Sequence, residues 1–509
     1  MPTPLYFRSL LTFSLVTVCA QSRADVSLPA IFGSNMVLQR DVPVPVWGWA
    51  DAGETVRVEI DGQSVSTVTG ADGHWHLKLA PLSVRESGDL VVSGKNTLTF
   101  TNVAVGEVWY CSGQSNMASF LSDQGEQAVA EAEDPQLRLY KVSSLLSAVP
   151  LDNRPGLNWQ PSTPKSAARF SGQAYYFGRT LRRELNVPVG VIAAAIGGSR
   201  IEPWISAEVS AATPELQSAS DHILKVNTAY LDQLATAGLP TDWLSQARQS
   251  VAARHSLPAL PPLPKDVQEK LPAHPLAADK QQPSTLYNGL VHHLMGFPVK
   301  GVIWQQGFSN QADAYGYIPK LKALVDSWRR AWGADIPVYY VQYPATQSVS
   351  AEFRDVQFAI LKAIPNTGMV TCSDVSTDLD LHPKNKHVVG PRIAMMAMNR
   401  TYGKPLKADT GPLYQSMAVE GAKIRVTFDQ VGSGLASRDG KPLDWFEIAA
   451  ATGAYVPAQA EIDGGTVLVW SPEITHPAKV RFAWNPIAVP NLMNQELLPA
   501  SVFRSHREP

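Results

Sequence analysis

Residues 106–117 read GEVWYCSGQSNM, an apolar run followed by a glycine and by a serine between two amides. The apolar part does not alternate with polar residues, which is typical of a strand buried on both faces of a parallel sheet. Gly113 predicts a turn, and residues 116–133 predict a helix. Ser115 therefore lies where a strand passes into a helix. There its hydroxyl either caps the helix or serves as a nucleophile beside the free N–H groups at the helix start.

Buried runs and helical patterns continue to alternate from residue 104 to about residue 403. Apolar runs such as VGVIAAAIGG, KGVIWQQG and IPVYYVQYP are separated by amphipathic stretches such as YIPKLKALVDSWRRAW. Strands of this kind, interleaved with helices, predict an α/β fold with a parallel sheet flanked by helices. A functional site is then expected in the loops at the carboxyl ends of the strands.

Two flanking regions, residues 25–103 and 404–509, have a different pattern. Short alternating runs such as ETVRVEIDG and KIRVTFDQV are separated by turn residues, which predicts a sandwich-like β domain at each end of the α/β region. Residues 207–283 interrupt the α/β region with an Ala-rich pattern and the proline-rich stretch SLPALPPLPKDV. We expect an insertion of helices followed by an extended rim, because proline at this density cannot continue a helix.

The composition limits the kinds of partner. The 509 residues include 43 Lys and Arg against 45 Asp and Glu, for a formal net charge of −2. This balance gives no basic surface for nucleic acid and no polybasic patch for a membrane. The expected partner is a small or neutral molecule, and the 13 Trp and 15 Tyr provide flat faces that suit sugars or fill cores.

The first 24 residues are expected to form a signal peptide. Arg8 precedes the apolar run LLTFSLVTV, and small residues follow, with cleavage predicted after Ala20 or Ala24. The chain is thus expected to be exported, to the periplasm or beyond, and no later apolar run is long enough to predict insertion into a membrane. Cys111 and Cys372, both in apolar runs, are expected to be free buried thiols rather than a disulfide.

Two further strand ends carry groups that suit acyl-transfer chemistry. One run ends in Gly197 and Gly198, where a backbone N–H can approach a ligand closely, and another is followed by Asn310, whose amide can donate a hydrogen bond. Each has a simpler explanation, a tight turn or a helix cap. Together with Ser115 they place a nucleophile and two donors at the ends of three strands, which is what an oxyanion hole requires.

A candidate base lies in the stretch STDLDLHPKNKHVVG, although a single histidine in a loop is more often a solvated surface residue. His382 precedes a proline and therefore lies in a loop just before a helix, and Asp380 is close enough in sequence to orient the ring. A pair formed by His382 and His387 could bind a metal ion. No His-Glu-x-x-His pattern or cysteine pair accompanies it, so no metal is expected.

Several blocks resemble the sialate O-acetylesterase family, a branch of the SGNH hydrolases. The blocks are GEVWYCSGQSNM, AIGGSRIEPW, LYNGLVHHLMGFPVKGVIWQQGFSN and DLHPKNK, with SNMVLQRDVPVPVWGWA and GLASRDGKPLDWFEIA in the flanking regions. The resemblance implies an SGNH-type α/β sheet and a serine carboxylic-ester hydrolase that removes O-acetyl groups from sugars without a metal or other cofactor.

The resemblance also implies a role for individual residues. Ser115 matches the nucleophile, His382 the general base and Asp380 the acidic residue of the Asp-x-His-Pro block. Many SGNH enzymes place the aspartate three residues before the histidine, where this chain has Leu379, so Asp378 and Asp374 stay open as alternatives. The oxyanion donors are matched by the N–H groups of Ser115 and Gly198 and by the amide of Asn310.

Four residues beside these positions are expected to contact the substrate, namely Gln114, Arg200, Gln306 and Phe308. Phe308 stands where the family usually has a glutamate. The resemblance favours 9-O-acetylated sialic acid, whose carboxylate Arg200 could bind. The alternatives are acetylated xylan or xyloglucan, and a carbohydrate-binding protein without activity. The oligomeric state and the role of residues 207–283 stay open.

Overall fold

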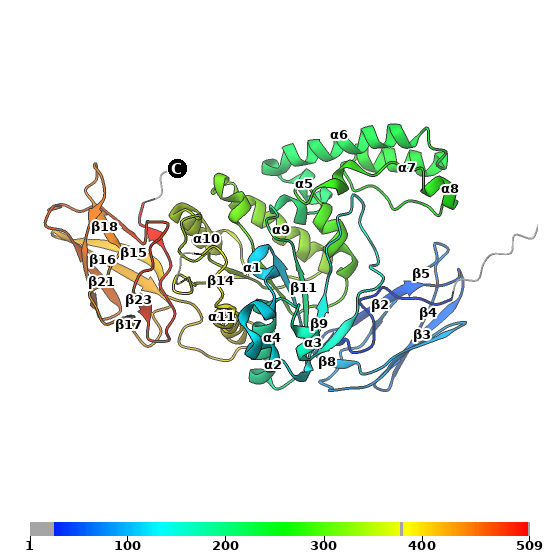
Figure 1. The fold of residues 1–509 in the computed structure, drawn as a ribbon, viewed down its shortest axis with the longest axis horizontal. Coiled ribbons are helices and arrows are strands. Elements are labelled where there is room, and N and C mark those ends of the chain that lie inside the picture. Colours follow the sequence, from blue (N-terminus) through cyan, green and yellow to red (C-terminus); the bar gives the residue numbers. More distant parts are fainter. Residues whose placement is uncertain (1–24, 377–379, 507–509) are drawn as a thin grey trace, which may run out of the picture.

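The computed structural model describes residues 25–376 and 380–506, and its centre is an eight-stranded sheet (Figure 1). Seven strands follow one another in the order β10 (Trp159–Ser162), β9 (Asp134–Lys141), β11 (Val189–Ala195), β8 (Ala104–Gly113), β12 (Gly301–Gln305), β13 (Val338–Val341) and β14 (Thr367–Val370). The eighth strand, β1 (Val37–Gln39), pairs in parallel with β8.

The sheet is parallel except at one edge, where β10 runs antiparallel to β9. The three central strands end together, because Gly113 of β8 is in register with Ala195 of β11 and with Gln305 of β12. The predicted α/β class is confirmed, with the antiparallel edge strand as an addition. The loops after β8, β11 and β12 therefore meet at one edge of the sheet.

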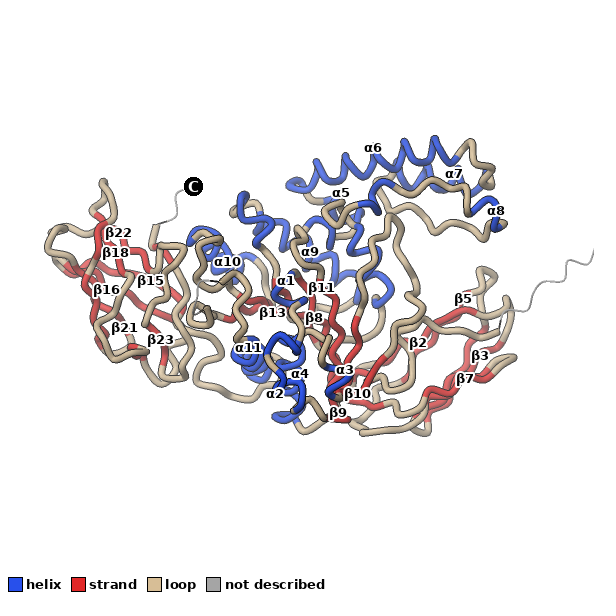
Figure 2. Tube along the Cα trace, in the orientation of Figure 1, coloured by secondary structure: helices blue, strands red, loops and turns tan. Residues whose placement is uncertain are grey.

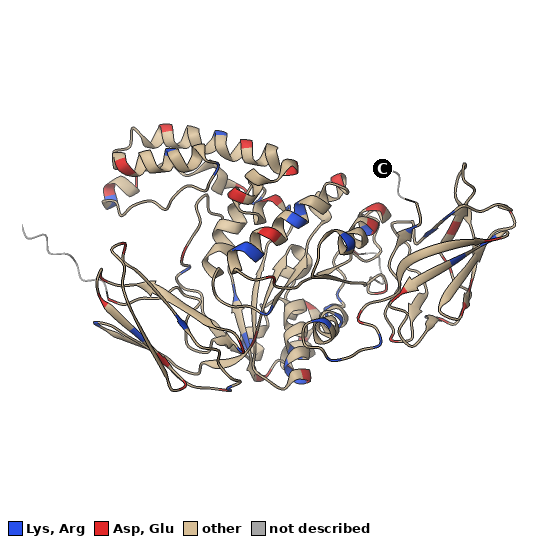
Figure 3. Cartoon of the chain, turned by 180° about the vertical axis from the view of Figure 1, so that it is seen from behind, with Lys and Arg blue, Asp and Glu red and all other residues tan. Residues whose placement is uncertain are grey.

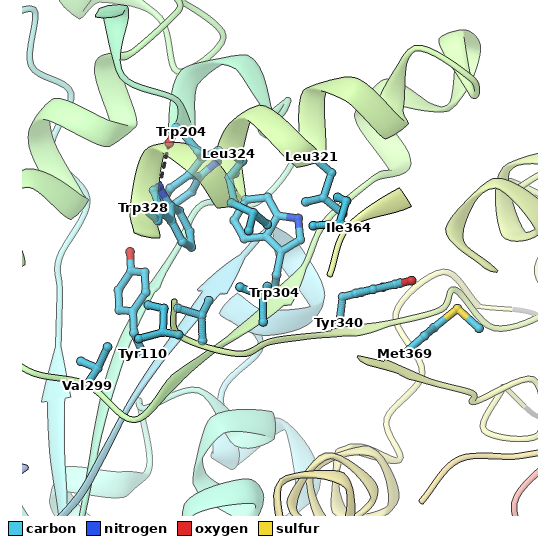
Figure 4. Close-up of a cluster of buried hydrophobic side chains, with 14 of the residues drawn as sticks. Tyr110, Trp204, Val299, Trp304, Leu321, Leu324, Trp328, Tyr340, Ile364 and Met369 are labelled. Carbon is cyan, nitrogen blue, oxygen red and sulfur yellow. Dashed lines mark hydrogen bonds between the residues drawn. The ribbon is translucent and has the colours of Figure 1, made fainter. Parts of the chain in front are cut away.

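Successive residues of β8 point to opposite faces of the sheet, as the strand period requires. Trp109 and Cys111 pack with α4 (Gly172–Leu185) and α11 (Lys386–Arg400), whereas Tyr110 packs with α9 (Tyr317–Trp332). Figure 4 shows the packing on the face of the sheet that α9 covers, where Tyr110 lies near Trp304 and Trp328. The helices nearest the sheet are α4 (Gly172–Leu185), α9 (Tyr317–Trp332), α10 (Ala351–Ala363) and α11 (Lys386–Arg400). Both faces of the sheet are thus covered, which explains why its strands are apolar throughout.

The helix predicted for residues 116–133 is wrong in its extent. The structure has three short pieces there, α1 (Ser115–Ala118), the 3-10 turn Leu121–Gln124 and α2 (Glu126–Ala130). The chain leaves helical geometry at Ser119, and Gly125 has a φ of +108°. A continuous helical pattern is therefore broken by local backbone geometry that only the packed structure defines.

Residues 207–283, predicted as an insertion, lie at the top of Figure 1 on the side where α1 begins. Their helices are α5 (Ala207–Ala212), α6 (Gln217–Leu234), α7 (Thr241–Ala252) and α8 (Lys265–Gln268). Between α7 and α8 the proline-rich stretch is a loop, drawn in tan in Figure 2. Tyr230, Leu234 and Trp243 belong to a small apolar cluster of their own. The segment is therefore a helical layer with its own core.

The flanking regions consist of antiparallel sheets. The N-terminal strands are β2 (Val44–Trp49), β3 (Thr55–Ile60), β4 (Gln63–Val68), β5 (His74–Leu79), β6 (Leu90–Ser93) and β7 (Thr97–Phe100). The C-terminal strands are β15 (Leu413–Glu420), β16 (Lys423–Asp429), β17 (Leu435–Ser437), β18 (Phe446–Ala449), β19 (Val456–Pro457), β20 (Gln459–Asp463), β21 (Thr466–Trp470), β22 (Lys479–Phe482), β23 (Leu492–Asn494) and β24 (Phe503–Arg504). The exact division into domains stays a prediction, since β1 of the N-terminal region joins the central sheet.

Charges of both signs are interspersed along the helices (Figure 3). Within residues 25–376 and 380–506, no helix is long and apolar enough to cross a membrane. The predicted signal peptide, residues 1–24, lies outside the described residues. Cys111 and Cys372 are free and buried, as predicted. Burial raises the pKa of the Cys372 thiol to about 12, so this thiol stays protonated and unreactive near neutral pH.

Candidate active site

The turn after β8 places Ser115 at the edge of the sheet. Gly113 has a φ of +141°, and a Cβ atom there would lie 2.1 Å from the carbonyl oxygen of Gln305. Only glycine fits this close approach of two strands. Gln114 is the N-cap of α1, so Ser115 is the first helical residue and its hydroxyl does not cap the helix. The capping explanation for Ser115 is therefore excluded.

The hydroxyl of Ser115 contacts a histidine from the other end of the α/β region. Ser115 Oγ lies 2.7 Å from His382 Nε2, although the residues are 267 positions apart in sequence. His382 belongs to the loop between β14 and α11, and its side chain is 47% exposed. A serine hydroxyl within hydrogen-bond distance of an imidazole nitrogen is the arrangement that activates a nucleophile.

Asp380 forms a hydrogen bond with the backbone of His382 and not with its ring. Asp380 Oδ1 accepts a 2.9 Å hydrogen bond from the backbone N–H of His382 and lies 3.9 Å from Nδ1 of the ring. The first distance is a hydrogen bond and the second is an electrostatic contact only. Asp374, one alternative, forms two 2.7 Å hydrogen bonds with Arg392. Asp378, the other alternative, lies outside the described residues.

Asn116 connects the two loops that carry Ser115 and His382. Its Nδ2 donates a 3.0 Å hydrogen bond to the carbonyl oxygen of Leu381, and its Oδ1 accepts one of 2.5 Å from Lys386 Nζ. Both Asn116 and Lys386 are almost fully buried, and burial lowers the pKa of the Lys386 ammonium to about 8. Neither residue was predicted from the sequence. Their signal was their place inside the two polar blocks that hold Ser115 and His382.

The backbone N–H groups of Ser115 and Gly198 lie at adjacent strand ends. A Cβ atom on Gly197 would be 3.7 Å from Cβ of Ser115, so the glycine turn lies against the serine. Gly198 has a φ of +71°, which favours glycine. Within the described residues, neither the Ser115 N–H nor the Gly198 N–H has a hydrogen-bond acceptor. Both donors are therefore available to a ligand.

The amide of Asn310 is held in one orientation. Its Oδ1 accepts hydrogen bonds from Ile201 N–H at 3.0 Å and from Gln306 Nε2 at 2.9 Å. Because two donors point at this oxygen, the opposite end of the amide must be the NH2 group. That group donates to the carboxylate of Glu202 at 3.1 and 3.2 Å, and Glu202 in turn pairs with Lys320 at 3.2 Å. Glu202 and Lys320 were not predicted from the sequence, although Glu202 lies in the block AIGGSRIEPW.

The remaining predicted residues divide into buried and exposed ones. Gln114 is buried, and its Oε1 accepts a 3.0 Å hydrogen bond from Gly307 N–H. Gln306 is buried as well and contacts Asn310. Phe308 is half-buried against the apolar core, and Arg200 is exposed. Of the four, Arg200 is thus best placed to meet a ligand from solvent, and both glutamines support the loops.

Comparison with known proteins gives the same family throughout. The family model described as carbohydrate esterase, sialic acid-specific acetylesterase, matches residues 105–228 and 278–399. The stretch between the two matched segments falls within the helical insertion. The matched segments carry Ser115, Gly198, Asn310 and His382.

Curated relatives and a solved structure extend the similarity to most of the chain. Sialate O-acetylesterase of Rattus norvegicus is 25% identical over 447 residues, covering 78% of this chain and 77% of the relative. The human enzyme is 25% identical over 431 residues, covering 75% of this chain and 72% of the relative. A crystal structure of a carbohydrate acetylesterase from Xanthomonas citri is 31% identical with a TM-score of 0.78, covering 95% of this chain and 100% of that one. The chain therefore belongs to the sialate O-acetylesterase family of carbohydrate esterases.

Proposed function

We propose that the chain hydrolyses O-acetyl esters of sugars with Ser115 as nucleophile and His382 as general base. The observation that carries this proposal is the 2.7 Å contact between Ser115 Oγ and His382 Nε2 at the carboxyl edge of a parallel sheet. The hydrogen bond from the buried Asn116 to Leu381 supports it, because it fixes the residue after the nucleophile to the residue before the base. Membership of a carbohydrate esterase family supplies the reaction class.

In the first half of the reaction, the enzyme becomes acetylated. His382 Nε2 accepts the hydroxyl proton while Ser115 Oγ attacks the acetyl carbonyl carbon, which gives a tetrahedral oxyanion. The N–H groups of Ser115 and Gly198 and the Asn310 amide donate hydrogen bonds to this oxyanion. His382 then gives the proton to the sugar oxygen, so the carbon–oxygen bond breaks and the sugar leaves as an alcohol.

In the second half, water replaces the sugar. His382 takes a proton from the water, and the hydroxide attacks the acetyl group on Ser115. The second tetrahedral intermediate collapses when the proton returns to Ser115 Oγ. The products are free enzyme and acetic acid, which ionises to acetate and gives its proton to water. The protons exchanged between Ser115, the sugar oxygen and the attacking water all pass through His382 Nε2, so this scheme needs no metal or cofactor.

Export to the periplasm or the exterior is part of the proposal. It is supported by the sequence of residues 1–24, with a basic residue, an apolar run and small residues before Ala24. N-terminal sequencing of the protein purified from culture medium or periplasm tests this. A new N-terminus after Ala20 or Ala24 is expected, and an intact N-terminus in the cytoplasm contradicts export.

For the substrate, we infer 9-O-acetylated sialic acid, with a site that meets the sugar carboxylate through Arg200. Support comes from Arg200, an exposed residue two positions after Gly198, whose side chain forms no ion pair with a carboxylate within the described residues. A guanidinium pairs well with a carboxylate, whereas neutral xylan or xyloglucan has none to offer.

The discriminating experiment compares acetate release from 9-O-acetylated sialic acid with release from acetylated xyloglucan and xylan. For the wild type we expect a higher kcat/KM on the sialic acid, and Arg200→Ala should lower that value alone. Arg248, which is exposed on α7, gives the control variant Arg248→Ala. Preference for the neutral polysaccharides with no effect of Arg200→Ala would assign the enzyme to plant cell-wall substrates instead.

A further inference from the structure

The end of the helical insertion returns to the active site and contacts the Gly197–Gly198 turn. Lys280 Nζ donates a 2.7 Å hydrogen bond to the carbonyl oxygen of Gly197. Gln281 Nε2 donates a 2.8 Å hydrogen bond to the carbonyl oxygen of Gly198, and Gln281 Oε1 accepts one of the same length from Arg200 N–H. Two consecutive residues of the insertion thus bind three backbone groups of the loop that follows β11, on Gly197, Gly198 and Arg200.

The bond from Lys280 acts on the peptide group that holds a proposed oxyanion donor. The carbonyl of Gly197 and the N–H of Gly198 belong to one planar trans peptide, so they point in opposite directions. Holding the oxygen on the side of Lys280 therefore directs the N–H to the other side. The next peptide is fixed as well, because Ser309 Oγ donates a 3.0 Å hydrogen bond to the carbonyl oxygen of Gly198.

Without such a contact, two consecutive glycines leave the peptide free to rotate. Neither residue has a Cβ atom, and glycine adopts positive and negative φ about equally readily. Rotation of this peptide by about half a turn would replace the N–H by a carbonyl oxygen. A carbonyl oxygen facing the developing oxyanion repels it, so one orientation is productive and the other is not.

Lys280 also places a positive charge beside the peptide between Gly197 and Gly198. Its side chain is half-buried, and within the described residues its ammonium group has no ion pair with a carboxylate. The Cβ position of Gly198 would lie 3.3 Å from Nζ, so the charge is close to the turn. A cation on a carbonyl oxygen polarises the peptide and makes its N–H a stronger donor, an effect that grows where water is excluded.

We propose that Lys280 is a positioning residue of the esterase, through which the helical insertion keeps the Gly198 N–H directed at the oxyanion. The inference rests on the proposed function, since it assumes that Gly198 N–H is an oxyanion donor. It gives residues 207–283 a part in catalysis. Lys280 acts through the peptide and does not need to touch the sugar, so its contribution appears in the transition state and not in substrate binding.

The test compares Lys280→Met with the wild type on an acetylated sugar. Methionine keeps the length of the stem and removes the donor and the charge. We expect kcat to fall about tenfold to a hundredfold with KM changed less than about twofold, because one donor of an oxyanion hole is misdirected. Affinity for methylboronic acid, which forms a tetrahedral anion on serine, should fall by the same factor as kcat. Lys280→Arg should restore most of the rate.

Control variants separate the effect of losing the Lys280 contact from a general effect of the substitution or of misfolding. Lys225→Met makes the same change at an exposed position of α6 and should leave kcat and KM unchanged. If Lys280→Met does not fold, Lys280→Gln offers the same comparison with a polar side chain that is too short for the contact. Thermal unfolding of each variant shows whether the insertion stays in place.

Two results would overturn the role of Lys280. One is a Lys280→Met enzyme whose kcat and boronate affinity equal those of the wild type. The other is a variant with a lowered unfolding temperature but unchanged kcat per folded molecule, which would make Lys280 only an attachment of the insertion. In both cases an inactive Ser115→Ala variant leaves the proposed function standing, whereas an active one removes that function and the inference with it.

Discussion

Asn116 Nδ2 donates a 3.0 Å hydrogen bond to the carbonyl oxygen of Leu381, so the residue after Ser115 holds the residue before His382. The Ser115–His382 distance is therefore set by a buried amide and not by the two side chains alone. Ser115 and His382 come from loops at opposite ends of the α/β region. Such a contact holds the two segments in one geometry before the reaction, so less entropy is lost when Ser115 and His382 come together in the transition state.

Asn116→Asp is expected to lower kcat about tenfold with little change in KM, because the donor to Leu381 is lost while an oxygen for Lys386 remains. Asn116→Ala should also lower the free energy of unfolding by about 1 to 3 kcal/mol, since a buried ammonium then lacks its acceptor. Steady-state kinetics and urea unfolding check both. Gln268→Ala, which removes an exposed amide-to-carbonyl bond, is the control. Unchanged kcat in Asn116→Asp would refute the positioning role.

The two aspartates are expected to separate catalysis from stability. Asp380→Asn keeps an oxygen for His382 N–H but removes the charge 3.9 Å from the ring. The variant should lower kcat about fivefold to tenfold at low salt. At high salt the loss of kcat should be smaller, because both side chains are nearly half exposed and salt screens the charge of Asp380. Asp374→Asn removes the charge and one of the two hydrogen bonds to Arg392, and it should lower the free energy of unfolding by about 1 to 3 kcal/mol. Full activity in Asp380→Asn together with inactive, stable Asp374→Asn would reverse these assignments.

The amide of Asn310 is expected to contribute about 3 kcal/mol to the transition state, so Asn310→Ala should lose roughly a hundredfold or more in kcat. Glu202→Gln keeps an acceptor for the amide but loses the pair with Lys320, and we expect a smaller loss, up to about tenfold. Asp326→Asn makes the same change in an exposed ion pair of α9 and should be silent. The order of the three rates tests the network, and a Glu202→Gln enzyme slower than Asn310→Ala would contradict it.

A buried histidine, His293, and a half-buried one, His274, predict a loss of stability in acid. Burial lowers the pKa of His274 from its ordinary 6.5 to about 4 and that of His293 to about 3. Between pH 6.5 and these lowered pKa values, the two imidazoles bind protons in the unfolded chain but not in the folded chain. The free energy of unfolding is therefore largest above pH 6.5 and falls as the pH decreases toward 3. Each histidine adds a slope of up to about 1.4 kcal/mol per pH unit.

The variant His293→Leu should flatten this acid limb, while His76→Leu on the exposed face of β5 should not. Urea unfolding at a series of pH values provides the measurement. An acid limb of the same slope in wild type and His293→Leu would show that the ring of His293 is protonated in the fold.

The sequence predicted the elements of the sheet well because their signal is local. Strands such as β8 are apolar along their whole length, and a residue that follows the end of a parallel strand must lie at the edge where Ser115, Gly198 and Asn310 meet. The helix expected for residues 116–133 failed for the opposite reason, because its break at Ser119 depends on packing.

Contacts between distant segments were beyond prediction. Asn116 meets Leu381 265 positions away, and Lys280 meets Gly197 at a distance of 83 positions. Nothing in a single block of sequence indicates such a partner. The same holds for Asp374, whose carboxylate turned out to pair with Arg392 on α11. The residue types in the sequence indicated which chemical groups are present. Which neighbours hold these groups was defined only by the fold.

The central claim is that Ser115 carries the acetyl group during turnover. The most direct measurement is mass spectrometry of peptides from enzyme mixed with an acetylated sugar and quenched in acid within the first turnovers. We predict an acetyl group on the peptide that contains Ser115, present in wild type and absent in Ser115→Ala, which should also release acetate no faster than buffer. Acetate release at the wild-type rate by Ser115→Ala, with no acetylated peptide in the wild type, would contradict the account.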